Sequence, residues 1–381
     1  NLSYGEVFSM IRLLHTGDVH LDSAFSGLDS RHAEIRRREL RDTFTAMMDY
    51  ACTEDIDLLL IAGDLFDGSS VTHETLALLI REFERFGKPV FIAPGNHDPA
   101  LPDSIWAKNR SRDLFPPNVH VFRTSELSSF DLDIRGIPVT VCGFAFTEST
   151  METVPLEGHT ADPDRLNLLV CHGDMLNPQS LTCPLTPAHL EAFGADYAAL
   201  GHIHNPPLPG HGNRFAYCGC PEARAFDETG PKGAIVADLD KTGVHLRRVR
   251  FSRRRYEKAE LALTGVSTQA EVREAVADFI EENGWGDDTL LSLRLTGMAA
   301  QSLVIDTESL ENTPFGLFYL RVEDATLPAL DFAALEKDIT VTGEVYRQLR
   351  PSLESDDPRT REVGIRALRY ALSALAGEKT F

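Results

Sequence analysis

The stretch Gly63-Asp64-Leu65-Phe66-Asp67 directly follows five apolar residues, LLLIA at positions 58–62. A short, continuous apolar run predicts a β-strand that is buried on both faces. Gly63 then gives a tight exit and leaves Asp64 at the carboxyl end of the strand, the edge where open α/β sheets collect their ligands. An Asp after a Gly can also be an ordinary turn residue or helix cap. The rest of the chain decides between these interpretations.

Four further apolar runs end in polar clusters of the same kind. These clusters are Asp18-Val19-His20, Gly95-Asn96-His97-Asp98, His172-Gly173-Asp174 and Gly201-His202-Ile203-His204. In Asp-x-His and His-x-His, the two side chains lie on the same side of an extended segment, so both can reach one site. Five such strand ends in one chain favour a shared metal site over five unrelated turns.

The residue types in these clusters indicate which metals the site would hold. Carboxylates, imidazoles and one Asn amide oxygen, without a thiolate, suit Mn²⁺, Fe or Zn better than a Cys-rich structural zinc site. Seven candidate ligands are too many for one tetrahedral ion and suit two ions. Two ions about 3.5–4 Å apart generate hydroxide near neutral pH and stabilise phosphoryl oxygens. The clusters therefore predict hydrolysis of a phosphate ester.

The order of the motifs resembles that of the calcineurin-like metallophosphoesterase superfamily: Asp-x-His, Gly-Asp-x-x-Asp, Gly-Asn-His-Asp, a later His and Gly-His-x-His. More narrowly, residues 15–22 (HTGDVHLD), 63–67 and 94–99 (PGNHDP) are similar to bacterial DNA repair exonucleases of the SbcD type, especially the YhaO-like branch. The resemblance covers roughly residues 10–250.

The resemblance implies a role for each polar side chain. One ion would be held by Asp18, His20, Asp64 and His204, and the other by Asp64, Asn96, His172 and His202. Asp64 would bridge two divalent ions, with Mn²⁺ favoured, and a bridging hydroxide would be the nucleophile. His97 would protonate the leaving oxygen or steady the transition state, and Asp98 would orient its ring. Archaeal and eukaryotic relatives often carry His in place of Asp67, which leaves open how a DNA end is presented.

The apolar patterns between these motifs predict an α/β (α+β) fold. Residues 119–122, 130–134 and 139–144 are expected to be antiparallel strands of a second sheet, and residues 234–239 and 244–251 a closing hairpin. The expected architecture is a two-sheet metallophosphoesterase sandwich flanked by helices. A small α/β capping domain and a C-terminal helical segment would follow it.

The length of 381 residues exceeds one typical core, so we expect several domains. Residues 10–257 would form the nuclease domain, 258–340 the α/β domain and 341–381 the helical segment. The resemblance implies that the α/β domain caps the active site and helps to select DNA; a stabilising or dimer-forming domain is the alternative. The stripe Ile365, Leu368, Leu372 and Leu375 in the last segment would pack on its own protein. The resemblance implies the alternative, that this segment docks onto an SMC-like ATPase of the SbcC/YhaN type.

The net charge of −21 argues against a generic nucleic-acid binder, for which a basic surface is expected. Arg36, Arg37 and Arg38 nevertheless cluster just after the first metal motif, where a phosphate backbone entering the site needs cations. Such a run can also be a solvated helix face. We treat the three arginines as candidate DNA contacts.

The composition is that of a globular protein, with 43% hydrophobic and 25% charged residues. No apolar run approaches the roughly 20 residues of a membrane span, and residues 1–9 lack the pattern of a signal peptide. The six cysteines have no scaffold spacing, and Cys218-x-Cys220 is expected to be a pair of small core residues rather than a metal site. These features predict a cytoplasmic protein with reduced thiols.

Two other functions share part of this pattern. A small-molecule phosphodiesterase or a protein phosphatase would use the same scaffold, but the added α/β domain and the arginines favour a nuclease. A non-catalytic module that recruits a partner ATPase would use the metals structurally, but the presence of His97 beside every ligand disfavours it. The sequence thus predicts a dinuclear metal-dependent phosphodiesterase that acts on DNA, as an exonuclease, an endonuclease or both.

Overall fold

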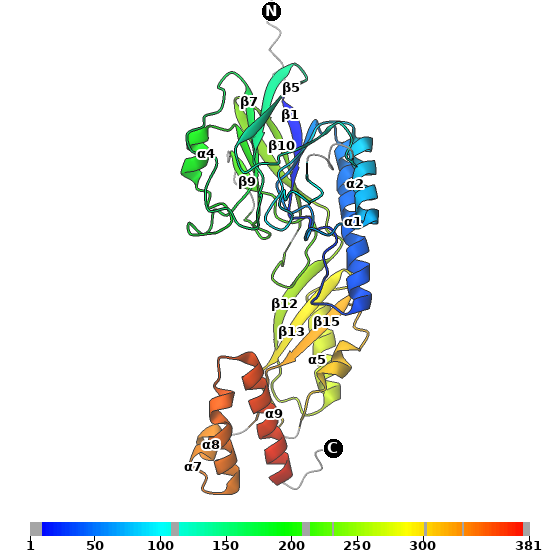
Figure 1. Cartoon of the computed structure of the whole chain (residues 1–381). Helices are drawn as coiled ribbons and strands as arrows, with labels where there is room; N and C mark the ends of the chain where they lie inside the picture. Colours follow the sequence, from blue (N-terminus) through cyan, green and yellow to red (C-terminus); the bar gives the residue numbers. More distant parts are fainter. Residues whose placement is uncertain are drawn as a thin grey trace, which may run out of the picture. The chain divides into compact units, whose positions relative to one another are not determined.

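The computed structural model describes residues 10–107, 114–207, 214–230, 232–300, 303–329 and 331–375. The chain divides into two compact units, Asn1–Arg253 and Arg254–Phe381 (Figure 1). The second unit contains both of the segments, 258–340 and 341–381, that the sequence predicts as separate parts. Their separate status stays a prediction.

A six-stranded mixed sheet runs through the first unit in the order β11-β10-β1-β2-β3-β4. Its parallel strands are β1 (Ile11–Thr16), β2 (Leu58–Ile61), β3 (Val90–Ile92) and β4 (Val119–Val121). The hairpin of β10 (Gly233–Asp240) and β11 (Gly243–Arg250) adds to β1 in antiparallel orientation, which confirms the predicted closing hairpin. The assignment of residues 119–122 to an antiparallel strand of the second sheet is wrong. This segment pairs parallel with β3, because three residues of mixed burial carry too little pattern to specify a sheet.

A five-stranded sheet forms the second layer in the order β5-β6-β7-β8-β9. Its strands are β5 (Ser128–Ile134), β6 (Ile137–Gly143), β7 (Leu166–His172), β8 (Tyr197–Gly201) and β9 (Phe215–Tyr217). Only the β5–β6 pair among them is antiparallel. One apolar core joins inward residues of both sheets, such as Leu13 and Leu60 from the first and Leu168 and Val170 from the second. The predicted two-sheet sandwich is therefore confirmed.

Helices cover the outer faces of the sandwich (Figure 1). α1 (Ser30–Thr53) and α2 (His73–Phe86) pack on the first sheet through a second core that includes Leu14 and Leu59, the neighbours of the inward-facing leucines. α4 (Pro187–Phe193) covers the second sheet through Leu190 and Phe193. Among the described residues, no helix combines the length and the apolar character that a membrane crossing requires.

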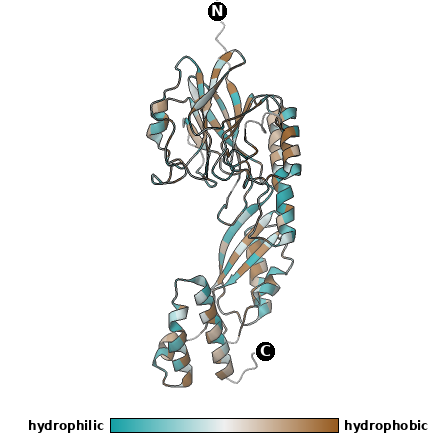
Figure 2. Ribbon diagram, in the orientation of Figure 1, coloured by the Kyte–Doolittle hydropathy of each residue, from teal (hydrophilic) through white to brown (hydrophobic). Residues whose placement is uncertain are grey.

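The second unit is built around three parallel strands, β12 (Arg255–Ala262), β13 (Thr289–Thr296) and β15 (Tyr319–Asp324). Figure 2 shows apolar and polar residues alternating along β13 and β15, as expected for strands with one face against a core. The helix α5 (Gln269–Glu282) begins at a capping box, in which Thr268 and Glu271 each accept from the other's backbone N–H. The short elements are β14 (Met298–Ala299), α6 (Thr307–Glu311) and β16 (Leu327–Pro328).

Three helices end the described chain: α7 (Phe332–Lys337), α8 (Val341–Leu353) and α9 (Pro358–Leu375). α9 begins after Asp357, whose carboxylate accepts from the N–H of Thr360. Its stripe residues Leu368 and Leu372 pack against α8 around Tyr346. This favours packing on the protein itself for these positions, and docking of a partner here stays a prediction.

His15 links the two sheets inside the sandwich. Its Nδ1 lies 2.8 Å from the hydroxyl of Tyr197 on β8, and its Nε2 lies 3.2 Å from the carbonyl oxygen of Leu200. The ring is completely buried, and this burial lowers the pKa of His15 to about 3. The folded protein therefore holds His15 neutral at any pH near physiological.

We expect His15 to make the metal-free protein less stable as the pH falls. Because its folded pKa lies below the unfolded value, the contribution of His15 is fully present above about pH 6.5 and is lost as the pH falls toward 3, by up to about 1.4 kcal/mol per pH unit. Urea unfolding with chelator at pH 7.5, 6.0 and 5.0 should give a shallower pH slope for His15→Gln than for wild type. The exposed-site control His159→Gln should keep the wild-type slope; equal slopes in all three proteins would contradict this expectation.

Arg36 lies in the protein interior, so its prediction as a DNA contact is wrong. Its guanidinium donates to Glu39 Oε2 at 2.6 Å, to Glu222 Oε1 at 2.7 Å and to the carbonyl of Ala223 at 2.9 Å. The side chain has no exposed surface. Arg36 lies on the face of helix α1 that points into the protein. Its burial is tolerated because two carboxylates pair with it.

Arg37 and Arg38 lie nearer the surface. Arg37 is half-buried and donates from Nη1 to the carbonyl of Ala24 at 3.3 Å, and Arg38 is exposed. These two arginines stay candidate DNA contacts.

We expect Arg36→Ala to lower the free energy of unfolding by about 3–5 kcal/mol, because Glu39 and Glu222 would be left buried without their cation. The matched variant Arg38→Ala, two residues along the same helix, should change it by less than about 0.5 kcal/mol. Urea unfolding of the metal-free proteins measures both values. Equal stability of the two variants would show that the buried cation contributes nothing.

Candidate metal centre

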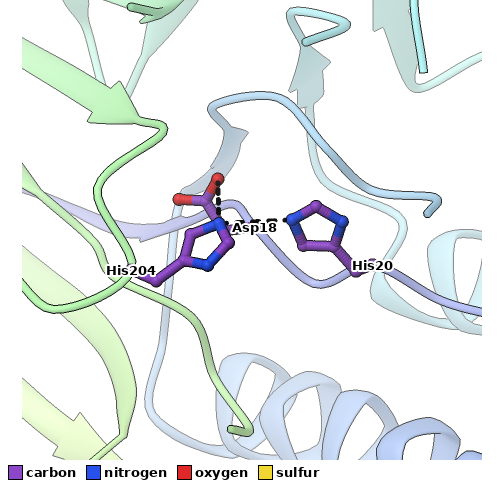
Figure 3. A group of neighbouring side chains, drawn as sticks. All are labelled: Asp18, His20 and His204. Atoms are coloured by element: carbon purple, nitrogen blue, oxygen red, sulfur yellow. Dashed lines mark hydrogen bonds and ion pairs between the residues drawn. The ribbon is translucent and has the colours of Figure 1, made fainter. Parts of the chain in front are cut away.

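The candidate ligands lie together at the carboxyl ends of strands from both sheets. Asp18 and His20 follow β1, Asp64 follows β2, Asn96 follows β3, His172 ends β7, and His202 and His204 follow β8. Figure 3 shows how residues far apart in the sequence meet here: the ring of His204 approaches both the ring of His20 and the carboxylate of Asp18. The parallel strands bring the motifs to one edge, as the sequence pattern predicts.

The first cluster consists of Asp18, His20 and His204, with Asp64 beside them. His20 Nε2 lies 3.3 Å from His204 Nε2 and 3.6 Å from Asp64 Oδ2. His204 Nε2 lies 3.6 Å from Asp18 Oδ1. Donor atoms that share one ion at about 2.1 Å are roughly 3.0–3.4 Å apart. The four side chains therefore fit one divalent ion.

The second cluster consists of Asp64, Asn96 and His172, with His202 beside them. His172 Nε2 lies 2.9 Å from Asn96 Oδ1 and 3.4 Å from Asp64 Oδ2. The His202 ring lies edge-on to that of His172, with centroids 5.2 Å apart, and its Nε2 lies 3.2 Å from Thr182 Oγ1. The ring of His202 thus lies beside this cluster, and its role as a ligand stays a prediction. Asp64 Oδ2 thus lies close to a histidine of each cluster, in the position of a bridging ligand.

Three ligand histidines are held in place through Nδ1. Asp67 Oδ1 lies 3.0 Å from His20 Nδ1, and the carbonyl oxygen of Ala62 lies 3.0 Å from His172 Nδ1. Glu228 Oε1 lies 2.7 Å from His204 Nδ1. Acceptors on Nδ1 place the proton there and leave the Nε2 lone pairs directed into the centre. Lone pairs that converge in this way can bind a divalent cation.

The carboxylates around His204 also favour a positive charge at its ring. Burial lowers its pKa, but the neighbouring carboxylates of Asp18 and Glu228 outweigh burial and raise the pKa of His204 to about 10. For Glu228, burial raises the pKa, but the hydrogen bond with His204 and the charge of Arg224 outweigh burial and lower this pKa to about 2. A metal ion at Nε2 would replace the proton that these carboxylates attract.

The sequence pattern does not reveal the supporting role of two of these residues. Glu228 has no motif spacing that would reveal it, since it lies in a loop after Cys220 and approaches His204 only in the folded chain. From the sequence, Asp67 is only a departure from related chains; in the structure its carboxylate holds the ring of His20.

The backbone is bent sharply at the ligands. Asp18, His20 and Asp64 have φ values of 48°, 50° and 48°, and His202 has a φ of 109°. Non-glycine residues rarely adopt these conformations, and such strain concentrates at functional sites. Gly63, with a φ of 90°, must lack a side chain, because a Cβ there would collide with the ring of His172.

Asp98 holds the ligand loops together, so the prediction that it orients the ring of His97 is wrong. Its carboxylate accepts from four backbone N–H groups at 2.8–3.2 Å, those of Asp64, Leu65, Phe66 and Gly95. Burial and the nearby Asp64 raise the pKa of Asp98, whereas these donors favour its charged form. Neighbouring side chains on the turn diverge: Asp98 points inward and is buried, and His97 is exposed.

His97 lies at the open side of the centre. Its ring packs edge-on against that of His20, with centroids 4.9 Å apart. Among the contacts of the described residues, none joins His97 to Asp98. The role of His97 toward a phosphate stays a prediction.

Cys218 and Cys220 are buried thiols behind the first cluster. Cys218 Sγ lies 4.0 Å from Asp18 Oδ2, and Cys220 Sγ lies 3.8 Å from Glu228 Oε2. Burial raises the pKa of both thiols well above its usual value, so they are protonated near neutral pH. No cysteine is among the described side chains whose donor atoms converge. The prediction of small core residues is confirmed.

We expect Asp98→Ala to lower the free energy of unfolding by at least about 2 kcal/mol, because four buried N–H groups lose their acceptor. It should also weaken the binding of both ions, since Asp98 supports the loops of Asp64 and Asn96. The neighbouring control His97→Ala, at an exposed position, should change stability by less than about 0.5 kcal/mol. Urea unfolding and Mn²⁺ titration measure these effects; a variant of Asp98 that only slows hydrolysis would favour the ring-orienting role.

Comparison with known proteins places these residues in a family. Residues 11–206 match the family described as calcineurin-like phosphoesterase, a span that contains every ligand candidate together with His97 and Asp98. The uncharacterized metallophosphoesterase YhaO of Bacillus subtilis is 29% identical over 307 residues, which cover 77% of this chain and 74% of that protein. The DNA double-strand break repair protein Mre11 of Haloferax volcanii is 26% identical, covering 83% and 68%. One of the subunits of the nuclease SbcCD of Escherichia coli is 27% identical, covering 58% and 62%.

Proposed function

Because the chain belongs to the calcineurin-like phosphoesterase family, we propose that it is a dinuclear metal-dependent phosphodiesterase that hydrolyses DNA. The observation that carries this proposal is the position of Asp64. Its Oδ2 lies 3.6 Å from Nε2 of His20 and 3.4 Å from Nε2 of His172, one histidine from each cluster. One buried carboxylate between two sets of converging donors is what a pair of divalent ions needs.

The two clusters are the proposed ion sites. The first ion is held by Asp18, His20, Asp64 and His204, and the second by Asp64, Asn96, His172 and His202. Mixed oxygen and nitrogen donors without a thiolate favour Mn²⁺, with Fe or Zn as alternatives. Two divalent ions supply an activated water and neutralise charge on the phosphoryl oxygens.

His97 is the proposed proton donor. It is the exposed member of a group with His20 and Asp67 whose donor atoms approach one another. It follows Asn96 directly, so the two side chains share one turn, Asn96 toward the second cluster and His97 toward solvent. A scissile phosphate that enters from the open side meets His97, which protonates the leaving oxygen.

DNA is the proposed substrate class because two relatives are a DNA repair protein and a nuclease subunit by name. With a net charge of −21, the chain needs local cations to accept a phosphate backbone. Arg37 and Arg38 are the proposed cations. We further propose that an SMC-like ATPase is a partner and that homodimers form. A small phosphodiester is the alternative substrate.

With Mn²⁺, we expect the purified protein to cleave linear duplex or single-stranded DNA and a small phosphodiester, and chelator to abolish all cleavage. His97→Ala should keep both ions but lower the hydrolysis rate by about 10²–10⁴, the usual contribution of a positioned acid. Metal analysis and initial rates measure the two effects separately.

The matched control is Asp64→Asn, which should lose bound metal together with activity. Loss of metal from His97→Ala would identify His97 as a ligand instead of the proton donor. Cleavage of the small phosphodiester without any cleavage of DNA would contradict the proposed substrate.

A further inference from the structure

Arg224 connects the two carboxylates that hold histidines of the first cluster. Its Nη1 donates to Asp67 Oδ1 at 2.7 Å, and its Nη2 donates to Glu228 Oε1 at 3.1 Å. Nη2 also lies 3.4 Å from Nδ1 of His204. The backbone N–H of Arg224 donates to the other oxygen of Glu228 at 2.6 Å. One residue thus fixes both carboxylates.

The same carboxylate oxygens serve the arginine and the histidines. Asp67 Oδ1 is the atom that contacts His20 Nδ1, and Glu228 Oε1 is the atom that contacts His204 Nδ1. With the 3.3 Å approach between Nε2 of His20 and Nε2 of His204, these contacts close a ring around one side of the first cluster. The orientation of both imidazoles depends on this ring.

An arginine suits this position for two reasons. Its planar guanidinium presents donors in a rigid fork and can hold two carboxylates at a fixed separation, whereas a lysine is a single point charge. It also supplies a cation between Asp67 and Glu228, whose negative charges would otherwise repel one another when the ion is absent. Only 14% of the Arg224 side chain is exposed, so solvent screens these interactions little.

The second cluster is held by other groups. His172 is fixed by the carbonyl oxygen of Ala62 and by Asn96, and His202 contacts Thr182. Histidines of the two clusters therefore have separate supports.

We propose that Arg224 is a positioning residue that presents His20 and His204 to the first ion. Loss of Arg224 then weakens the binding of the first ion and leaves the binding of the second ion unchanged. The inference rests on the proposed function, because both ion sites belong to it.

The test is Mn²⁺ binding to the full-length protein, measured by calorimetric titration and electron paramagnetic resonance. Wild type should bind two ions and show a spin-coupled signal. Arg224→Gln should bind one ion with unchanged affinity and the other about 10–100-fold more weakly, the usual cost of losing a group that orients a ligand. At one equivalent, its spectrum should show an uncoupled single ion.

The matched control is Arg135→Gln. Arg135 also bridges two carboxylates of the first unit, with Nη2 2.5 Å from Asp55 Oδ2 and Nε 2.7 Å from Asp57 Oδ1, but these carboxylates hold no ligand. Both ions should bind to it as they do to wild type. If Arg224→Gln does not fold, Arg224→Lys makes the same test, because its single ammonium restores the charge without the fork.

Two further backgrounds identify the ion that is affected. The variant Asn96→Ala should still bind the first ion, and adding Arg224→Gln to it should lower the affinity for that ion. The variant His20→Ala should still bind the second ion, and adding Arg224→Gln to it should leave the affinity for that ion unchanged. Equal weakening in both backgrounds, or two-ion binding in Arg224→Gln as in wild type, would overturn the inference. Fewer than two ions in wild type would instead overturn the proposed function on which it rests.

Discussion

The buried carboxylate of Asp64 is the constraint on which the rest of the centre depends. Only 1% of the residue is exposed, and a buried charge is costly unless hydrogen bonds and opposite charges compensate it. The N–H of His97 donates to Oδ1 at 2.9 Å, while Oδ2 lies between His20 and His172. One side of the carboxylate is thus satisfied by the protein, and the other is left for cations.

This arrangement requires a rigid support, because several polar groups must converge where water cannot separate them. The strained backbone at Asp18 and Asp64, the closeness of Gly63 to His172, and the four N–H donors bound by Asp98 all serve this purpose. Each holds a loop in a conformation that it would not keep in isolation. The stability of the sandwich therefore offsets the strain of the centre.

Two arginines of the first unit, one buried and one partly buried, each compensate a pair of carboxylates. Arg36 compensates Glu39 and Glu222 in the packing of α1, and Arg224 compensates Asp67 and Glu228 beside the ligands. Both occupy positions where several carboxylates meet. In a chain with a net charge of −21, some of the arginines thus pair with carboxylates inside the protein. An arginine cluster in the sequence is therefore a poor guide to a DNA-binding surface.

The sequence by itself determined the sandwich, its buried strands and the position of the centre. Short apolar runs that end in Asp, Asn or His specify both the strand and the edge where it terminates, as at Asp64 and His172. Only the tertiary structure decided which way Arg36 and Asp98 point, which sheet takes β4, and that Glu228 and Arg224 support the ligands. The physical reason is that apolar periodicity is local, whereas the partner of a charged side chain is set by packing between segments far apart in the chain.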